Sequence, residues 1–287
     1  MRMRIGLSVF LTLAAGLLMG AGLLLDNTKG EVAKTSGATT TTIAGTTAAA
    51  PLGGYSNLVV ISNSVNYVGI TADYLVLTDG TPSAIGDAKT TGNVSVSALI
   101  TTAGVNGLDG GAEGASLWYA VWVINNGTTT SALLSLSSTA PTMPSGYTYK
   151  RRVGWVRNDG SSNFVTMQQI GFIVTSPLVS IVDAGTATSN TDLDLSAIVP
   201  TTARQAMLVG LTLASASVAV QSTNLTIVDK LTGLDHSSFD FRGDASSTSW
   251  YTPISVIVPL NTNRVFQYRT GTNNRGTIYV IGWHDSL

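Results

Sequence analysis

Residues 117–159 read LWYAVWVINNGTTTSALLSLSSTAPTMPSGYTYKRRVGWVRND. The stretch begins with a run of aromatic and β-branched residues at 117–124, and these residue types favour the pleated backbone of a strand. Asn126-Gly127 follows, and Asn-Gly readily adopts the positive φ values of a tight primed turn. A second apolar run comes at 132–136. The stretch therefore predicts a β-hairpin.

The first strand of this hairpin is apolar on both of its faces. Successive side chains of a strand point to opposite sides, which gives two sets: Trp118, Ala120, Trp122 and Ile124, and Leu117, Tyr119, Val121 and Val123. Such a strand is covered twice, once by its own core and once by a second layer or a neighbouring subunit. From this we predict a homotrimer, with a dimer or a monomer as the alternatives.

Composition indicates the same structural class independently. The chain has 287 residues, 11% of them charged, a formal net charge of -1 and no cysteine. It is rich in Gly, Ser and Thr, and it reads as all-β. Without cysteine, disulfides have no part in its stability. The basic residues cluster only at Lys150-Arg151-Arg152, which we interpret as a solvated or subunit-paired strand edge, so nucleic acid is not an expected partner.

The same stretch also carries a family resemblance. WYAVWVI at 118–124, followed by SLSSTAPTMPSGYTYKRRVGW at 135–155, resembles the β-rich modules of tailed-bacteriophage virion proteins, namely tail fibres and capsid-attached fibres or decorations. The resemblance covers about residues 53–172 and, more loosely, IYVIGWHD at 278–285. It implies a virion structural protein that contacts other capsid or tail proteins and contributes to binding of the host surface.

Turn signals and composition divide the chain into four segments. Residues 1–25 form an apolar anchor or docking segment, and 26–55 form a Thr/Ala/Gly-rich linker. Short strands separated by turn residues follow at 56–176 and again at 177–287. We expect two tandem β-sandwich, jelly-roll-like domains. Val153-Gly154-Trp155 in the first and Ile281-Gly282-Trp283 in the second hint that the two domains have related folds.

The N-terminal segment has two interpretations. Arg2 and Arg4 precede an uncharged stretch at 5–25, which fits a signal peptide or a membrane span. Its first dozen residues also alternate with a period of two, which is typical of a strand. Under the strand interpretation the segment docks onto another virion protein through one face, made of Met3, Ile5, Leu7, Val9, Leu11 and Leu13. Under the membrane interpretation the protein is an exported or membrane-anchored cell-surface adhesin or carbohydrate-binding module.

The sequence shows no constellation for catalysis. Its two histidines, His236 and His284, lie in a polar loop and near the C-terminus, and no Gly-x-Ser-x-Gly elbow accompanies them. A pair of carboxylates could cleave a glycoside, but most of the candidates lie beside Gly, Ser or Asn, where carboxylates commonly cap turns, so we favour a role in turns for Asp109, Glu113, Asp229, Asp235, Asp240 and Asp244. We therefore expect no enzyme.

No metal or cofactor is expected either. The loop at 107–114 holds Asp109 and Glu113, and Asp192 lies two residues from Asp194, but neither pair has EF-hand spacing. A zinc site is not expected, because the chain has no cysteine and only two histidines. The glycine-rich loop lacks the Lys-Ser or Lys-Thr of a phosphate-binding loop.

Aromatic residues remain as candidates for binding. Most of them alternate along predicted strands and are assigned to the core. Trp250 and Tyr251 differ, because they follow the polar loop 243–249, and we predict that they bind a surface ligand such as a host glycan.

Overall fold

The computed structural model describes residues 22–26, 31–35, 41–43, 54–80, 88–214, 221–230, 238–245, 252–271 and 274–287. Side chains are described from residue 54 onward, except in 212–214, 221–224, 238–245, 252–254 and 274. In these ranges every regular element is a β-strand, which confirms the all-β fold class. The chain divides into two compact units, Met1–Leu52 and Gly53–Leu287.

The first unit contains three short strands, β1 (Gly22–Asp26), β2 (Glu31–Thr35) and β3 (Thr41–Ile43). They form an antiparallel sheet in the order β1-β2-β3. Two of these strands lie where the sequence predicts a linker. Thr, Val and Ile favour strands even in a stretch that has too few large apolar residues for a core.

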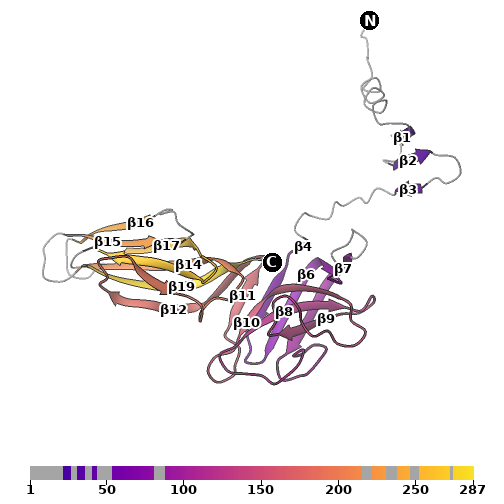
Figure 1. The fold of residues 1–287 in the computed structure, drawn as a ribbon, viewed down its shortest axis with the longest axis horizontal. Helices are drawn as coiled ribbons and strands as arrows, with labels where there is room; N and C mark the ends of the chain where they lie inside the picture. Colours follow the sequence, from indigo (N-terminus) through magenta and orange to yellow (C-terminus); the bar gives the residue numbers. More distant parts are fainter. Residues whose placement is uncertain are drawn as a thin grey trace, which may run out of the picture. The chain divides into compact units, whose positions relative to one another are not determined.

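The second unit begins with a sandwich that we call the first sandwich. Its strands are β4 (Tyr55–Ser56), β5 (Val59–Ser62), β6 (Tyr67–Thr78), β7 (Ala88–Leu99), β8 (Trp118–Asn125), β9 (Thr130–Ser135), β10 (Tyr149–Arg157) and β11 (Met167–Ile170). The long strand β6 pairs with β5, β4 and β7, and at Thr78 it pairs with Lys150 of β10. From there the sheet continues as β10-β8-β9, which packs over β5, β6 and β7 (Figure 1).

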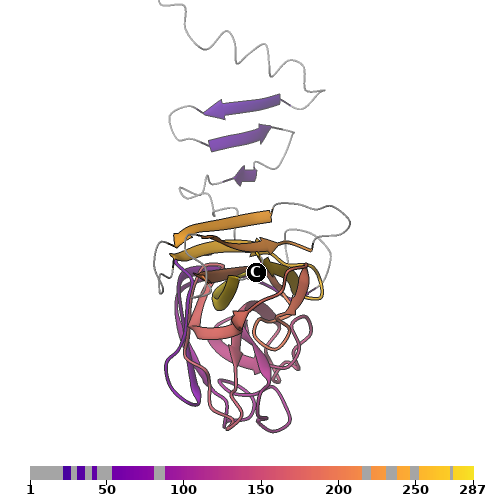
Figure 2. The ribbon, with the colours of Figure 1, turned by 90° about the vertical axis from the view of Figure 1, so that its left-hand side faces the viewer.

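The second sandwich follows along the chain (Figure 2). Its strands are β12 (Ile173–Gly185), β13 (Thr191–Asp194), β14 (Ala203–Ala214), β15 (Gln221–Val228), β16 (Ser238–Ala245), β17 (Thr252–Pro259), β18 (Val265–Thr270) and β19 (Asn274–Asp285). One sheet has the order β17-β14-β19-β12, and the other has the order β13-β18-β15-β16. Leu225 packs between them, where Gly210 and Gly276 leave room for its methyl groups.

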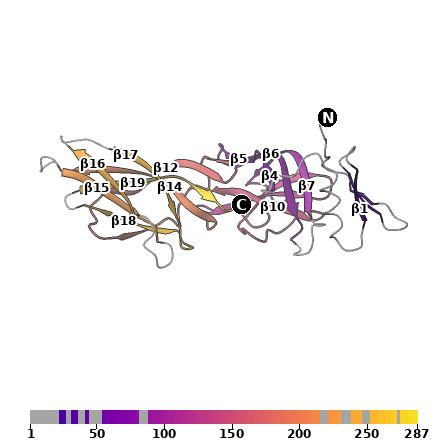
Figure 3. The ribbon, with the colours of Figure 1, turned by 90° about the horizontal axis from the view of Figure 1, so that it is seen from above.

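The two sandwiches share a sheet and a core. Strand β12 pairs with β19 on one side and with β11 on the other, so a single 12-stranded sheet passes from one sandwich to the next (Figure 3). A continuous apolar core extends from Leu58 to Trp283. The predicted boundary at 176/177 lies inside β12. The division into two tandem domains stays a prediction.

The predicted hairpin is present as β8 and β9, which pair antiparallel from Ala120–Ser135 to Asn125–Thr130. Its turn has four residues, not the tight two-residue turn that the Asn-Gly pair predicts. Gly127 has a φ of 103°, but Asn126 uses its side-chain oxygen to accept hydrogen bonds from the N–H groups of Thr128 and Thr129. This Asx-type arrangement lengthens the turn.

The chain itself covers both faces of β8. Tyr119, Val121 and Val123 belong to the main core. The opposite face forms a second cluster made of Ala120, Trp122, Ile124, Leu133 and Trp155, against which Trp118, Met143 and Tyr147 pack. The second layer therefore comes from the same subunit, and the reason given for a homotrimer through this hairpin no longer applies.

Candidate functional site

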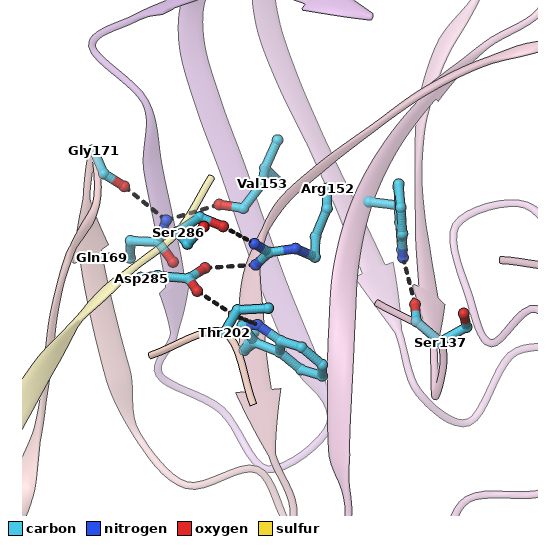
Figure 4. A network of polar contacts seen from close by, with 10 residues as sticks. Ser137, Arg152, Val153, Gln169, Gly171, Thr202, Asp285 and Ser286 are labelled. Atoms are coloured by element: carbon cyan, nitrogen blue, oxygen red, sulfur yellow. Dashed lines mark hydrogen bonds and ion pairs between the residues drawn. The ribbon is translucent and has the colours of Figure 1, made fainter. Parts of the chain in front are cut away.

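The junction of the two sandwiches holds a buried ion pair. Arg152 of β10 reaches from the first sandwich to Asp285 at the end of β19, with 2.5 Å between Nη1 and Oδ2 (Figure 4). The Arg152 side chain is 10% exposed and that of Asp285 is fully buried. Arg152 also donates to the carbonyl of Ser286. Two charges removed from water are stable only when each has close partners, so this contact depends on both sandwiches.

The second oxygen of the Asp285 carboxylate is bound by the hydroxyl of Thr202, which is in turn bound by the indole of Trp155. Thr202 donates its hydroxyl proton to Oδ1 of Asp285, and Trp155 donates its indole N–H to the same hydroxyl oxygen at 2.7 Å. The chain of donors runs from β10 through the turn before β14 to β19. Asp285 and Thr202 of the second sandwich thus each have a partner in the first sandwich, Arg152 and Trp155.

Three tryptophans lie beside the ion pair. Trp118 makes edge-to-face contacts with Trp155 and Trp283, at centroid distances of 6.3 Å and 5.4 Å. The Arg152 guanidinium lies 5.7 Å from the centroid of the Trp155 ring. The two Gly-Trp segments that the sequence marks as similar therefore meet at one place, around Trp118. Edge-to-face geometry is the favoured arrangement of aromatic pairs.

Gly154 shapes β10 at this junction. The pairing of β10 with β8 shifts register between Arg152 and Gly154, which marks a bulge. A Cβ on Gly154 would lie 2.4 Å from Oε1 of Gln169, whose amide donates to the carbonyls of Val153 and Gly171 (Figure 4). The bulge turns Arg152 and Trp155 toward the second sandwich, and only glycine leaves room for Gln169.

The basic triplet is not a free strand edge, contrary to the interpretation from sequence. Arg151 donates to the carbonyls of Gly54 and Val76 and lies 5.5 Å from the ring centroid of Tyr55. Burial lowers the pKa of Arg151 from its usual value, and the guanidinium stays protonated at neutral pH. Arg152 has the partners described above. Arg151 and Arg152 pair with the apolar residues Val123 and Trp122 of β8, a pairing that the run of basic residues does not reveal.

Of the candidate catalytic carboxylates, Asp109, Glu113 and Asp229 have described side chains. Asp109 accepts a hydrogen bond from the backbone N–H of Thr142, and Glu113 accepts one from the side-chain amide of Asn158. Asp229 is buried, at 4% exposure. Asp235 and the side chains of Asp240 and Asp244 lie outside the described residues. Asp109 and Glu113 thus hold loop segments in position through hydrogen bonds, which is the role predicted for carboxylates in turns.

The residues weighed as metal ligands also have protein partners. Asp192 is bonded to Lys230 and Gln267, and Asp194 accepts a hydrogen bond from the backbone N–H of Ser196. His284 is bonded to Gln205, with 2.6 Å between Nδ1 and Oε1. Within the part of the chain that the structure describes, no group of three or more such side chains could hold a metal ion.

The predicted binding residues cannot be placed. The docking set Met3, Ile5, Leu7, Val9, Leu11 and Leu13 lies outside the described residues, as do Trp250, Tyr251 and His236. Among the residues that are described, no helix is both long and apolar enough to cross a membrane. The aromatic residues assigned to the core are confirmed there for Trp122, Trp155, Tyr268 and Trp283, all at most 8% exposed.

We predict that acid weakens the second sandwich through Asp192 and Asp194. Hydrogen bonds from Lys230 and from the N–H of Ser196 hold the pKa of each carboxyl below its usual 3.8. The folded state therefore binds fewer protons than the unfolded state, and the stabilisation is present above about pH 4 and lost as the pH falls below it. Because the ion pair with Lys230 is exposed, Asp192→Asn should lower the urea midpoint only slightly at pH 7, and still less at pH 3. An equal loss at both pH values would contradict this assignment.

Comparisons with known proteins give weak matches only. No protein-family model and no curated protein matches the chain. Among solved structures, the VP2 subviral particle of infectious bursal disease virus shares 12% identity, with a TM-score of 0.23, over 92% of this chain and 64% of that chain. The Gx strain of the same virus shares 14% identity, with a TM-score of 0.22, over 91% and 63%. This chain thus spans just under two thirds of their length. Overlaps of this size define neither fold nor function.

Proposed function

We propose that the protein is a non-enzymatic structural protein of a tailed-bacteriophage virion, a fibre-like or decoration-like appendage attached through its N-terminal segment. The observation that carries the proposal is the resemblance of residues 117–159 to such modules. These residues form β8, β9, β10 and the connections between them. The same stretch supplies Arg152 and Trp155 to the junction, so the segment that resembles virion modules also joins the two sandwiches.

The polar groups of the described residues support a structural role. Asp109 and Glu113 accept hydrogen bonds from Thr142 and Asn158, which are distant in sequence, and Asp159 and Asp194 accept them from backbone N–H groups of their own turns. The buried carboxylate of Asp285 is neutralised by Arg152. Groups engaged in this way hold loops and strands in position, as expected of a protein that must stay rigid.

A second candidate function is an exported cell-surface adhesin or carbohydrate-binding module. The observation that favours it is the uncharged stretch 5–25 after Arg2 and Arg4. Such a protein would be found at the cell surface, and Trp250 and Tyr251 would contact a glycan. N-terminal sequencing of native material separates the two functions, because loss of residues before Asp26 indicates export processing and contradicts docking.

The attachment model predicts a position-specific effect in the N-terminal segment. If this segment adds a strand to another virion protein, Leu7 and Val9 fill pockets on one face. Replacing both by Ser should reduce attachment about a hundredfold, because each buried aliphatic side chain contributes about 1.5–3 kcal/mol. The measurement is the copy number of the protein on purified particles.

The matched control replaces Ser8 and Phe10, which lie on the opposite face of the same strand. Attachment should tolerate that pair. An equal loss from both pairs contradicts the strand model, and association with lipid without any virion protein would support the membrane interpretation.

A further inference from the structure

The sheet that passes through both sandwiches has an outward face whose residues follow from the register. Inward rows are buried, for example Val174, Trp283, Ala206 and Val258 at 0–2% exposure. The rows between them point away from the core. Across β11, β12, β19, β14 and β17, the first of these rows is Ile170, Ile173, His284, Gln205 and Pro259. The second row is Gln168, Thr175, Gly282, Met207 and Ile257. The third row begins at β12 and is Ser180, Tyr279, Val209 and Ser255. We call these residues, together with Leu178, the outer face.

The outer face is uncharged and rich in apolar side chains. None of its residues is Asp, Glu, Lys or Arg; the exposed Arg275 lies on the same side of β19 but beyond Thr277, outside the outer face. Ile170 and Leu178 are each 60% exposed, Ile257 is 46% exposed and Ile173 is 40% exposed. The outward face of an antiparallel sheet is normally polar when water covers it. Contiguous exposed apolar surface instead marks a place where a partner binds.

The outer face is large enough for a specific interface. The named rows run over 168–170, 173–180, 279–284, 205–209 and 255–259, and at about 4.8 Å between strands and about 3.3 Å per residue they span roughly 430 Å² of flat sheet. Side chains that stand up from this plane present more accessible surface than the plane itself. Stable interfaces bury about 800 Å² on each partner. With the side chains included, the outer face approaches the lower end of the range for specific interfaces, about 600 Å² on each partner.

We propose that the occupant of the outer face is the outer face of a second copy of this chain, related by a two-fold axis. A surface without charged groups is electrostatically complementary to itself. It offers no cations for a polyanion and no dense set of polar groups for a sugar. Two apolar sheet faces pack against each other in sandwiches, and a two-fold axis brings the same patch together from both subunits.

The proposal is tested by the mass of the full chain in solution, measured by light scattering at tens of micromolar protein. The native chain is expected to be a dimer. The variant Leu178→Lys with Ile257→Lys should raise the dissociation constant at least about a hundredfold, because each subunit would bring two charged lysines into an apolar interface that excludes water. Both side chains are exposed in the single subunit, so the fold should persist, as far-UV circular dichroism would show.

Leu136→Lys is the matched control, because Leu136 is also 60% exposed but lies after β9, away from the outer face. This variant should remain dimeric. A monomeric native chain, or a mass unchanged by the double substitution, would overturn the proposal. So would dissociation of the Leu136→Lys variant.

A cross-linking experiment separates this contact from association through residues 1–25. The chain has no cysteine, so Val209→Cys introduces a single reactive thiol on β14, next to the central strand β19 of the outer face. A short bis-maleimide should join two copies of Val209→Cys and should not join two copies of Leu136→Cys. Equal cross-linking of both variants would show that the outer face is not the interface.

Discussion

Replacing Arg152 by Ala is expected to lower the free energy of unfolding by about 3–5 kcal/mol, because it leaves the carboxylate of Asp285 buried without its cation. Asp285 would keep the Thr202 hydroxyl as a partner, but a neutral donor cannot offset a buried negative charge. The loss should appear as a lower midpoint in urea unfolding at neutral pH.

Two controls identify the cause of that loss. The double replacement Arg152→Met with Asp285→Leu removes both charges and should restore most of the stability, since an apolar pair of similar volume is often neutral or stabilising. Lys230→Ala breaks an ion pair whose side chains are 43% and 52% exposed, and it should change the midpoint little. A loss after Arg152→Ala no larger than after Lys230→Ala would contradict a buried ion pair.

Replacing Trp283 by Ala is expected to cost about 3–5 kcal/mol, the usual range for a buried tryptophan. Trp283 is 1% exposed, and its ring packs edge-to-face on Trp118. The variant Trp283→Phe keeps an aromatic ring and should lose less. Near-ultraviolet circular dichroism should also weaken, because the tryptophans at the junction lose their fixed environment.

Tyr279→Ala is the control for Trp283→Ala. Tyr279 lies on the same strand, on the outer face, and it pairs with Val209 and Ser180. Its loss from the single subunit should cost clearly less than the loss of Trp283. Equal destabilisation by the two replacements would show that the junction has no special part in holding the sandwiches together.

The sequence was sufficient to predict the all-β class and the central hairpin, because both depend on local signals. Aromatic and β-branched residues at 117–124 indicate a strand, and Gly127 provides the positive φ of the turn. The length of the turn was wrong, because hydrogen bonds from Thr128 and Thr129 to the Asn126 side chain decide it, and strand propensity does not reveal them.

The junction could not be predicted, because its partners are far apart in the sequence. Arg152 and Asp285 are separated by 133 residues, and no local pattern indicates that they pair. The shared Gly-Trp pattern at Trp155 and Trp283 pointed to related folds, whereas the structure brings the two rings to the same tryptophan, Trp118. The predicted boundary beside Pro177 falls within β12, where register shifts between Thr175 and Val179 accommodate the proline.

The place of β19 within its sheet has a consequence for the order in which the protein can fold. Strand β19 lies between β12 and β14, although β12 ends at Gly185 and β19 begins only at Asn274. During synthesis, β12 and β14 each have one edge without a partner strand until β19 has emerged from the ribosome. Unpaired edges of this kind recruit strands from other chains. The fold thus contains an interval of synthesis in which neighbouring nascent chains can exchange strands.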